Sequence, residues 1–288
     1  MNEYLKRLNV SPGVRPRCVY FLGAGASKAV CPMLPLASEL TCEHLLDLKS
    51  YKLPPSEAVY QLRTYLEQTG QLERALPLGF EDFLPHLATN RGPFWPYENA
   101  LFCLLRRPLF DGTESFGLGL WLNAARHLGD AIVTTNYDTV VEWELGLSGE
   151  GIIGAGGADL LDLGIPTDWL APGVRALFSQ VGGTACDKLL LLKLYGSVSW
   201  NACVKCDLCS LHPIYDHGAE DAITMRNPCT VCNQRDSLRI VAVPLVRGKG
   251  PENQHKVISE IWRRARVALA SCTDANDMRR FTAIWFSH

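Results

Sequence analysis

The sequence predicts an α/β fold around a parallel sheet, with a small cysteine-rich module inserted into it. Two observations predict this class. Strand-like apolar runs alternate with stretches of helical periodicity, and this alternation is typical of βαβ units. Two C-x-x-C pairs then interrupt the alternation in the last third of the chain. Apolar residues make up 47% of the 288 residues, which is enough for a sizeable core.

Four apolar runs are expected to form strands: 17–22, 131–134, 189–194 and 238–243. Helix-sized intervals separate them, which favours parallel pairing. Glycine-rich or polar clusters follow the first three runs directly, at 23–27, 135–138 and 195–197. Because ligands of parallel sheets bind beyond the carboxyl ends of the strands, we expect these three clusters to meet at one edge.

Helical periodicity is clearest in three segments. Apolar residues recur at helical spacing in 38–48 and 57–68, and one apolar face runs from Val257 to Leu269. The segment 147–173 is instead rich in glycine and proline, so we expect a loop over the site there. Its Gly-Ala-Gly-Gly sequence follows no strand-like run and is interpreted as flexible loop.

The charge pattern and the apolar runs exclude several classes of protein. The net charge is −2 and the basic residues are dispersed, whereas a nucleic-acid surface would show a basic stripe. No apolar run is long enough to cross a membrane. The polar segment 1–16 lacks the apolar core of a signal peptide. We therefore expect a cytoplasmic protein that binds neither nucleic acid nor membranes.

Eleven cysteines in a reducing compartment indicate metal binding where they cluster and core packing where they are scattered. Six of them stand singly among apolar neighbours and are interpreted as small buried side chains: Cys18, Cys31, Cys42, Cys103, Cys186 and Cys272.

Four other cysteines form two C-x-x-C pairs, Cys203 with Cys206 and Cys229 with Cys232. This spacing places four thiolates around a tetrahedral zinc ion, and a filled coordination sphere makes such a zinc structural. Cys209 offers an alternative near-side pair with Cys206, and is otherwise a packing cysteine. His212 and His217 lie between the pairs and could replace a cysteine ligand, although solvated loop histidines are the simpler interpretation.

The glycine turn GAGAS at residues 23–27 is a weak motif by itself. The dinucleotide fingerprint requires a third glycine where Lys28 stands, and the phosphate-loop pattern is absent. A tight turn before a helix can still direct backbone N–H groups at a diphosphate.

The order of the motifs is more specific than any one of them. GAGAS at 23–27, TTNYD at 134–138, KLYGS at 193–197 and the two C-x-x-C pairs follow one another along the chain. Together they resemble the sirtuin family, and more closely its prokaryote-like branch of sirtuin-like domains. The MLPL sequence at 33–36 with Glu39 and Leu40, the FEDF sequence at 80–83, and Trp200 are also similar. The resemblance covers about residues 17 to 270.

The resemblance implies a Rossmann-like, doubly wound parallel sheet formed by 17–198 and 233–288, with a zinc-ribbon-like module at 199–232. It implies NAD as co-substrate between these parts. By position, Asn136 would hold the nicotinamide ribose or a water near its anomeric carbon, and Asp138 would support that loop. The other residues implied in NAD binding are Gly23, Ala24, Gly25, Ser27, Thr135, Gly196 and Ser197.

The sequence departs from the family at the catalytic base. The family has a histidine in the KLHGS setting, where this chain has Tyr195. Tyrosine has a reference pKa of about 10, against about 6.5 for histidine, so it is a poor base at neutral pH. His127 and His86 offer no evident substitute. The family also has a strand and a glycine-serine turn after the last helix, for which only 281–286 and Ser287 are candidates.

These features lead to an NAD hydrolase as the first hypothesis, because the FEDF sequence resembles the NAD-hydrolysing branch. An NAD-dependent deacylase acting on acyl-lysine proteins is the related activity. The alternative is a catalytically impaired module that binds NAD or ADP-ribose and acts through a partner effector, since Tyr195 replaces the base. A third hypothesis is an interaction protein that uses the zinc module as its binding surface. An oligomer is compatible with all three.

Overall fold

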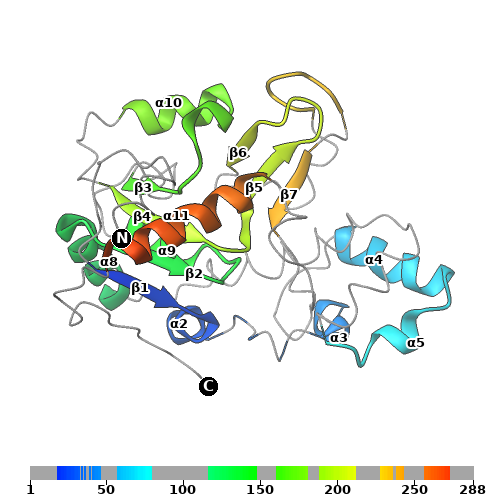
Figure 1. Ribbon diagram of the computed structural model, residues 1–288. Coiled ribbons are helices and arrows are strands. Elements are labelled where there is room, and N and C mark those ends of the chain that lie inside the picture. Colours follow the sequence, from blue (N-terminus) through cyan, green and yellow to red (C-terminus); the bar gives the residue numbers. More distant parts are fainter. Residues whose placement is uncertain are drawn as a thin grey trace.

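The computed structural model describes residues 18–32, 34, 36, 39, 41–46, 57–79, 116–147, 160–180, 188–211, 228–235, 238–242 and 256–272. It shows the predicted α/β fold: a four-stranded parallel sheet, a smaller antiparallel sheet inserted beside it, and a cluster of four cysteines (Figure 1).

The parallel sheet has the strand order β1-β2-β4-β3. Three strands lie where the apolar runs predicted them: β1 (Val19–Leu22), β2 (Ala131–Thr134) and β4 (Leu189–Lys193). The fourth is β3 (Leu161–Asp162), inside the segment 147–173 that we expected to be a loop. That expectation was wrong for these residues, because two residues are too few to show a strand period in the sequence.

The register of the parallel strands aligns their carboxyl ends. Leu22 lies beside Thr134, and Thr134 lies beside Lys193. The residues that follow β1, β2 and β4 therefore leave the sheet at the same edge, as expected for the three polar clusters.

Helices cover both faces of this sheet, as in a doubly wound fold. Adjacent side chains on a strand point to opposite faces. On β4, Lys193 bonds to Glu142 of α9 (Val140–Leu147). The adjacent residue, Leu192, points to the opposite face. There its side chain and that of Ile261 of α11 (Lys256–Cys272) both lie beside Gly164. Figure 1 shows α11 crossing in front of the sheet, and every residue of β2 between the helix layers is buried.

The antiparallel sheet has the order β6-β5-β7. Its central strand β5 (Gly196–Cys203) follows β4 after a two-residue turn, and β6 is Cys209–Leu211. The predicted strand at 238–243 exists as β7 (Leu238–Ala242), but its place in the parallel sheet was wrong. It pairs antiparallel with β5, a choice of partner that strand periodicity does not encode. The division at residue 199 falls inside β5, and the domain boundaries stay a prediction.

The remaining helices are η4 (Thr167–Trp169), α2 (Ala24–Val30), α3 (Cys42–Leu46), α4 (Glu57–Gln68), α5 (Leu72–Ala75), α8 (Phe116–Leu128) and α10 (Pro172–Gln180). The bounds of α4 agree with the prediction, whereas α3 covers only part of the 38–48 segment. Thr41 forms an isolated antiparallel bridge with Gly79, so its backbone is extended and α3 begins after it.

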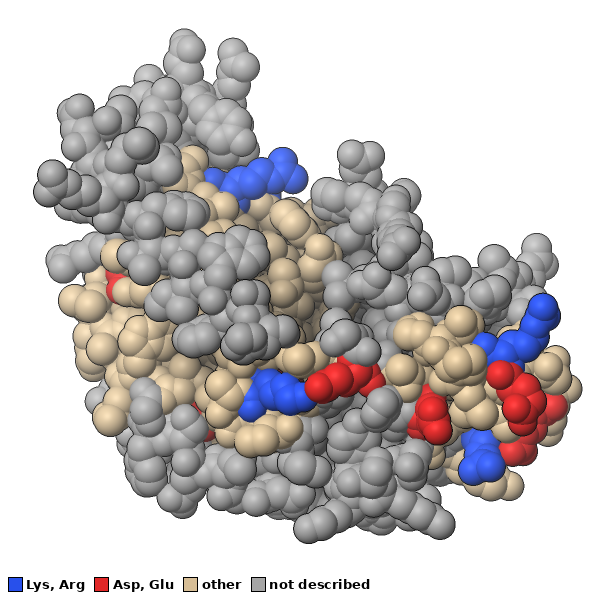
Figure 2. All heavy atoms as spheres, turned by 90° about the horizontal axis from the view of Figure 1, so that it is seen from below, with Lys and Arg blue, Asp and Glu red and all other residues tan. Residues whose placement is uncertain are grey.

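Charges of both signs alternate on the described surface. Figure 2 shows acidic and basic side chains gathered together at the side formed by α4 and α5, with no broad basic area among the coloured residues. Among the residues described, no helix combines the length and the apolar character needed to cross a membrane.

Candidate functional site

The glycine turn after β1 lies at the edge where the three clusters meet. Gly23 precedes α2 in an extended conformation, with φ −99° and ψ −180°. Its carbonyl oxygen accepts a hydrogen bond from the Ala26 N–H at 3.0 Å, which closes the turn. A Cβ atom built on Gly23 would meet nothing within 4 Å. The backbone therefore borders open space where a ligand could approach closely.

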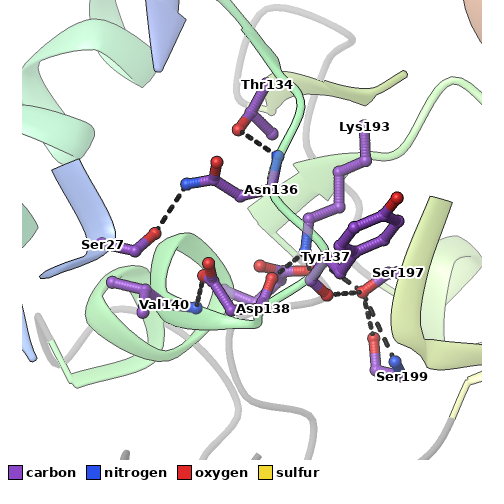
Figure 3. Close-up of polar contacts among 10 residues, drawn as sticks. Ser27, Thr134, Asn136, Tyr137, Asp138, Val140, Lys193, Ser197 and Ser199 are labelled. Carbon is purple, nitrogen blue, oxygen red and sulfur yellow. Dashed lines mark hydrogen bonds and ion pairs between the residues drawn. The ribbon is translucent and has the colours of Figure 1, made fainter. Parts of the chain in front are cut away.

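Asn136 connects the loop after β2 to this glycine turn. Its side-chain Nδ2 donates to the Gly23 carbonyl oxygen at 2.9 Å and to the Ser27 hydroxyl at 2.7 Å. The Asn136 backbone N–H donates to Thr134 Oγ1 at 3.0 Å, and the Thr134 hydroxyl donates to the Leu22 carbonyl at 2.8 Å. Figure 3 shows the side-chain carbonyl oxygen of Asn136 pointing away from Ser27. Two hydrogen bonds thus fix the orientation of the side-chain amide, and a third holds the backbone of the same residue.

Asp138 stabilises the end of the same loop. Its carboxylate oxygen Oδ1 accepts a hydrogen bond from the Val140 N–H at 3.0 Å, at the first residue of α9 (Figure 3). A carboxylate here satisfies a backbone donor that the helix leaves unpaired and opposes the positive end of the helix dipole. Asp138 therefore caps α9, and the part in NAD cleavage that the resemblance implied for it stays a prediction. Thr135, which directly precedes Asn136, is exposed.

Lys193 is the residue that sequence reasoning missed. It is the last residue of β4 and only 1% exposed. Its ammonium group donates to the Asp138 carbonyl oxygen, to Glu142 Oε1 at 2.6 Å and to the Ser197 hydroxyl at 3.1 Å. The signal was present in the sequence, because a lysine directly after four leucines is a charge at the end of a buried strand.

Ser197 belongs to the same buried network. Its hydroxyl donates to the Tyr137 carbonyl oxygen at 3.3 Å and lies 3.0 Å from the Ser199 hydroxyl. The Val198 N–H also donates to the Tyr137 carbonyl, at 3.0 Å. Ser197 has no exposed surface, so in this structure its bonds serve the protein itself. Its predicted contact with NAD stays a prediction, as does that of the buried Gly196.

Glu142 is the acidic partner in this network. Burial raises the pKa of its carboxyl group, and the nearby Lys193 ammonium opposes that shift without cancelling it. Glu142 Oε1 pairs with Lys193, while its second oxygen is buried and has no hydrogen-bond partner among the residues that the structure describes. The ion pair between Lys193 and Glu142 is therefore almost fully removed from water, and it lies beside the loop that carries Asn136.

Tyr195 occupies the turn between β4 and β5 and contacts aromatic rings. Its ring centroid lies 6.5 Å from that of Tyr137 and 6.0 Å from that of Trp262, the latter in an edge-to-face arrangement. The position expected for a histidine base therefore holds a half-buried aromatic contact with α11. His127, on α8, is exposed, and His86 lies outside the described residues.

Lys28, which replaces the third glycine of the dinucleotide fingerprint, is engaged elsewhere. Its ammonium group lies 2.5 Å from Glu39, and Glu39 also accepts the Leu36 N–H at 2.9 Å. The pair ties the end of α2 to the segment with the MLPL sequence. The FEDF sequence at 80–83 and the C-terminal candidates at 281–287 lie outside the described residues.

The four cysteines of the two C-x-x-C pairs gather into one cluster. The Sγ atoms of Cys203, Cys206, Cys229 and Cys232 all lie within 4.8 Å of one another. Cys203 Sγ is 3.6 Å from Cys232 Sγ, and Cys206 Sγ is 3.7 Å from Cys229 Sγ. Four sulfurs at such separations fit around one tetrahedral ion with zinc–sulfur bonds of about 2.3 Å.

The two cysteine turns repeat the same backbone pattern. The amide two residues after the first cysteine points to its sulfur, from Lys205 at 3.4 Å and from Val231 at 3.5 Å. The residue after each second cysteine, Asp207 or Asn233, has a positive φ and donates its N–H to the first cysteine's carbonyl oxygen at 2.8 Å. Two identical turns that direct amides at sulfur suit thiolates bound to a metal.

Cys209 lies outside this cluster. It is buried in β6, where its carbonyl oxygen accepts the Ala171 N–H at 2.7 Å. Burial raises the pKa of its thiol to about 12, as expected of a packing cysteine. Cys31 and Cys42 are also buried and Cys18 is half-buried. His212, His217, Cys103 and Cys186 lie outside the described residues, as does the side chain of Cys272.

Comparisons with known proteins found no matching family model and no matching curated protein. Solved structures that match include "Structure of Sir2Tm bound to a propionylated peptide" at 14% identity and TM-score 0.34, and "Sir2-p53 peptide-NAD+" at 15% identity and TM-score 0.35. Each match covers 93% of this chain and 70% of the other. Scores this low establish no common fold, so the likeness to sirtuins depends on the sequence motifs and the four-cysteine cluster.

Proposed function

We propose that this chain is a sirtuin-like NAD-binding protein that hydrolyses the bond between nicotinamide and ribose. The observation that carries the proposal is the Asn136 amide, which hydrogen bonds hold against the glycine turn at 2.9 Å and 2.7 Å. Two motifs that are separated by more than a hundred residues thereby form one polar edge of the sheet. The order of the sirtuin-like motifs supports the same substrate.

The residues at this edge fit a dinucleotide. Open space borders Gly23, so its backbone and that of Ala24 and Gly25 would hold the pyrophosphate, with Ser27 beside them. Thr135 is exposed at the same edge and would contact a ribose. Lys28 contributes little to phosphate binding, because its charge is paired with Glu39.

Asn136 would serve the chemical step through its side-chain carbonyl oxygen. Its Nδ2 is committed to the turn, so the carbonyl end is directed away from Ser27 (Figure 3). Cleavage of the nicotinamide–ribose bond develops positive charge at the anomeric carbon. A preorganised amide dipole in a site with little water stabilises that charge and can position the attacking water.

Hydrolysis is favoured over deacylation by the residue at position 195. Deacylation requires a base that takes a proton from a ribose hydroxyl, and Tyr195 is a poor base that contacts the rings of Tyr137 and Trp262. In hydrolysis water attacks the ribose carbon, and this step depends less on a strong base than deacylation does. Acyl-lysine proteins remain the second class of substrate, as the resemblance implies.

Nicotinamide release from NAD tests the proposal. Purified protein should release nicotinamide above the buffer rate, and Asn136→Ala should abolish the release. Tyr195→Phe retains the aromatic contacts and should keep the activity, if the hydroxyl is not a base. Absence of release from the wild type, with release restored in Tyr195→His, would overturn the hydrolase proposal.

The aromatic contacts of Tyr195 favour a second candidate function, a regulatory module that binds NAD or ADP-ribose without cleaving it and acts through a partner. Calorimetric titration with both ligands distinguishes the candidates. Binding without nicotinamide release would support the module. Absence of heat at millimolar ligand would contradict both proposals and leave an interaction protein as the remaining hypothesis.

The four cysteines would hold a structural zinc ion. All four ligand positions would be protein thiolates, which leaves none for a catalytic water. Thiolate ligands also fit a reducing compartment such as the cytoplasm.

A further inference from the structure

Lys193 carries a charged ammonium group in a buried position, which requires specific stabilising contacts. The strand before it is made of four leucines, and the side chain of Lys193 is 1% exposed. Removing an ammonium group from water is costly unless all its donors find acceptors. Lys193 has three donors and three acceptors around it, the Asp138 carbonyl, Glu142 Oε1 and the Ser197 hydroxyl.

The three acceptors come from three separate parts of the fold. Asp138 is in the loop after β2, Glu142 is in α9, and Ser197 is in β5 (Figure 3). Lys193 itself ends β4. One side chain therefore joins the two loops at the carboxyl edge of the sheet to the helix and the strand that follow them.

The joined loop is the one that carries Asn136. One residue, Tyr137, separates Asn136 from Asp138, whose carbonyl Lys193 binds. The Tyr137 carbonyl accepts bonds from Val198 at 3.0 Å and Ser197 at 3.3 Å. Thr134 and Gly23 hold the other side of Asn136. Lys193 thus adds an anchor on the C-terminal side of Asn136, next to the bonds that Val198 and Ser197 make to Tyr137.

We propose that Lys193 is a positioning residue, which holds the Asn136 loop against β5 through Asp138 and Ser197 and has Glu142 as its counter-charge. The proposal rests on the proposed function for the role of Asn136. Lys193 touches no ligand in this account, since it is buried behind the loop and acts only through the residues that it binds.

Two variants separate positioning from simple stabilisation. Glu142→Leu leaves the buried Lys193 ammonium group without its counter-charge, so it should lower the melting temperature, while the bonds from Lys193 to Asp138 and Ser197 keep the loop anchored. The double variant Lys193→Met with Glu142→Leu replaces the pair with apolar side chains, an exchange that often preserves or raises stability. It removes the anchor of the loop.

If Lys193 positions the loop, kcat and melting temperature should rank the two variants in opposite order. The variant that melts at the lower temperature should keep the higher kcat. The double variant should lose about a hundredfold in kcat for nicotinamide release, as expected when a reacting group is misplaced by about 1 Å. Glu142→Leu should keep more of kcat than the double variant, although it melts lower. If kcat instead follows the melting temperature in both variants, Lys193 has only a structural role and the proposal fails.

Amide hydrogen exchange of residues 135–139 tests the inference independently of the reaction. The double variant should exchange these amides at least about tenfold faster than the wild type, with the amides of β1 unchanged as internal control. Faster exchange in the double variant, together with a wild type that releases no nicotinamide, would refute the proposed hydrolase and keep the positioning role. Unchanged exchange would overturn the positioning role whatever the activity.

Discussion

Asn136 is the residue whose chemistry the proposed site depends on most directly. Asn136→Asp keeps the shape but replaces a donor by a carboxylate, which would face the Gly23 carbonyl oxygen at the present 2.9 Å. The bond to the Gly23 carbonyl is lost and two acceptors then face each other, whereas the Ser27 hydroxyl can donate to the new carboxylate. An acceptor left without its donor should lower the free energy of unfolding by about 2 kcal/mol. Nicotinamide release should be lost.

Urea denaturation of Asn136→Asp measures the first effect, and Thr135→Ala is its matched control. Thr135 is the adjacent residue and is exposed, so its substitution should change the free energy of unfolding by less than about 0.5 kcal/mol. Equal stability of Asn136→Asp and the wild type would show that the bond to the Gly23 carbonyl contributes nothing.

Glu142 should make stability depend on pH. Burial raises the pKa of its carboxyl group in the folded protein above the ordinary value of 4.5. The folded state therefore holds this proton more tightly than the unfolded state, and the stability it contributes is lost as the pH rises through the raised pKa. Relative to Glu142→Gln, the wild type should become less stable between about pH 5 and about pH 8.

Urea denaturation of both proteins at the two pH values measures how the free energy of unfolding of each changes with pH. The Gln variant cannot titrate at this position, so it controls for all other groups. A relative stability of the wild type that increases with pH would mean that pairing with Lys193, and not burial, dominates the pKa of Glu142.

At the scale of elements, the contact between β5 and β7 depends on Gly196. Its φ is +83°, and a Cβ atom there would lie 1.9 Å from the Val241 carbonyl oxygen of β7. Gly196→Ala should therefore lower the free energy of unfolding by about 3 kcal/mol or more, from backbone strain and steric overlap together. Thermal or chemical denaturation measures this.

Gly173→Ala in α10 is the matched control. A Cβ at Gly173 meets nothing within 4 Å and the residue is helical and exposed, so alanine should stabilise by up to about 1 kcal/mol. A Gly196→Ala protein as stable as the wild type would contradict the close approach of β5 and β7.

At the scale of the molecule, the cysteine cluster and the parallel sheet are joined at several points. The Ala171 N–H bonds to the Cys209 carbonyl, and Lys256 of α11 pairs with Asp207 beside the cluster. The same Lys256 lies 4.8 Å from the Trp169 ring centroid. β5 also runs without interruption from the Lys193 network to Cys203. The cluster is thus attached to both the sheet and α11.

Removal of zinc should for this reason lower the melting temperature of the whole chain. Metal analysis should find zinc in the wild type and little in Cys229→Ser, and a chelator should lower the melting temperature of the wild type but not that of Cys229→Ser. Cys209→Ala is the control, since Cys209 lies outside the cluster, and it should keep its zinc. A melting temperature unchanged by chelation or by Cys229→Ser would contradict the zinc assignment.

Features carried by short stretches of chain could be predicted from the sequence. The strands β1, β2 and β4, the helix α4 and the two cysteine turns each have a signal within a few residues, either a period or a spacing. The meeting of the three polar clusters at one edge also followed, because parallel strands share their carboxyl ends.

Other features depend on partners far apart in the chain, which only the tertiary structure identifies. β3 is too short to have a period, and β7 joined the antiparallel sheet because β5 offered an edge to it. Lys193 binds Glu142, 51 residues away, and Tyr195 meets Trp262 of α11. Local propensity specifies what a segment can become, whereas burial and pairing at a distance decide which side chains form the site.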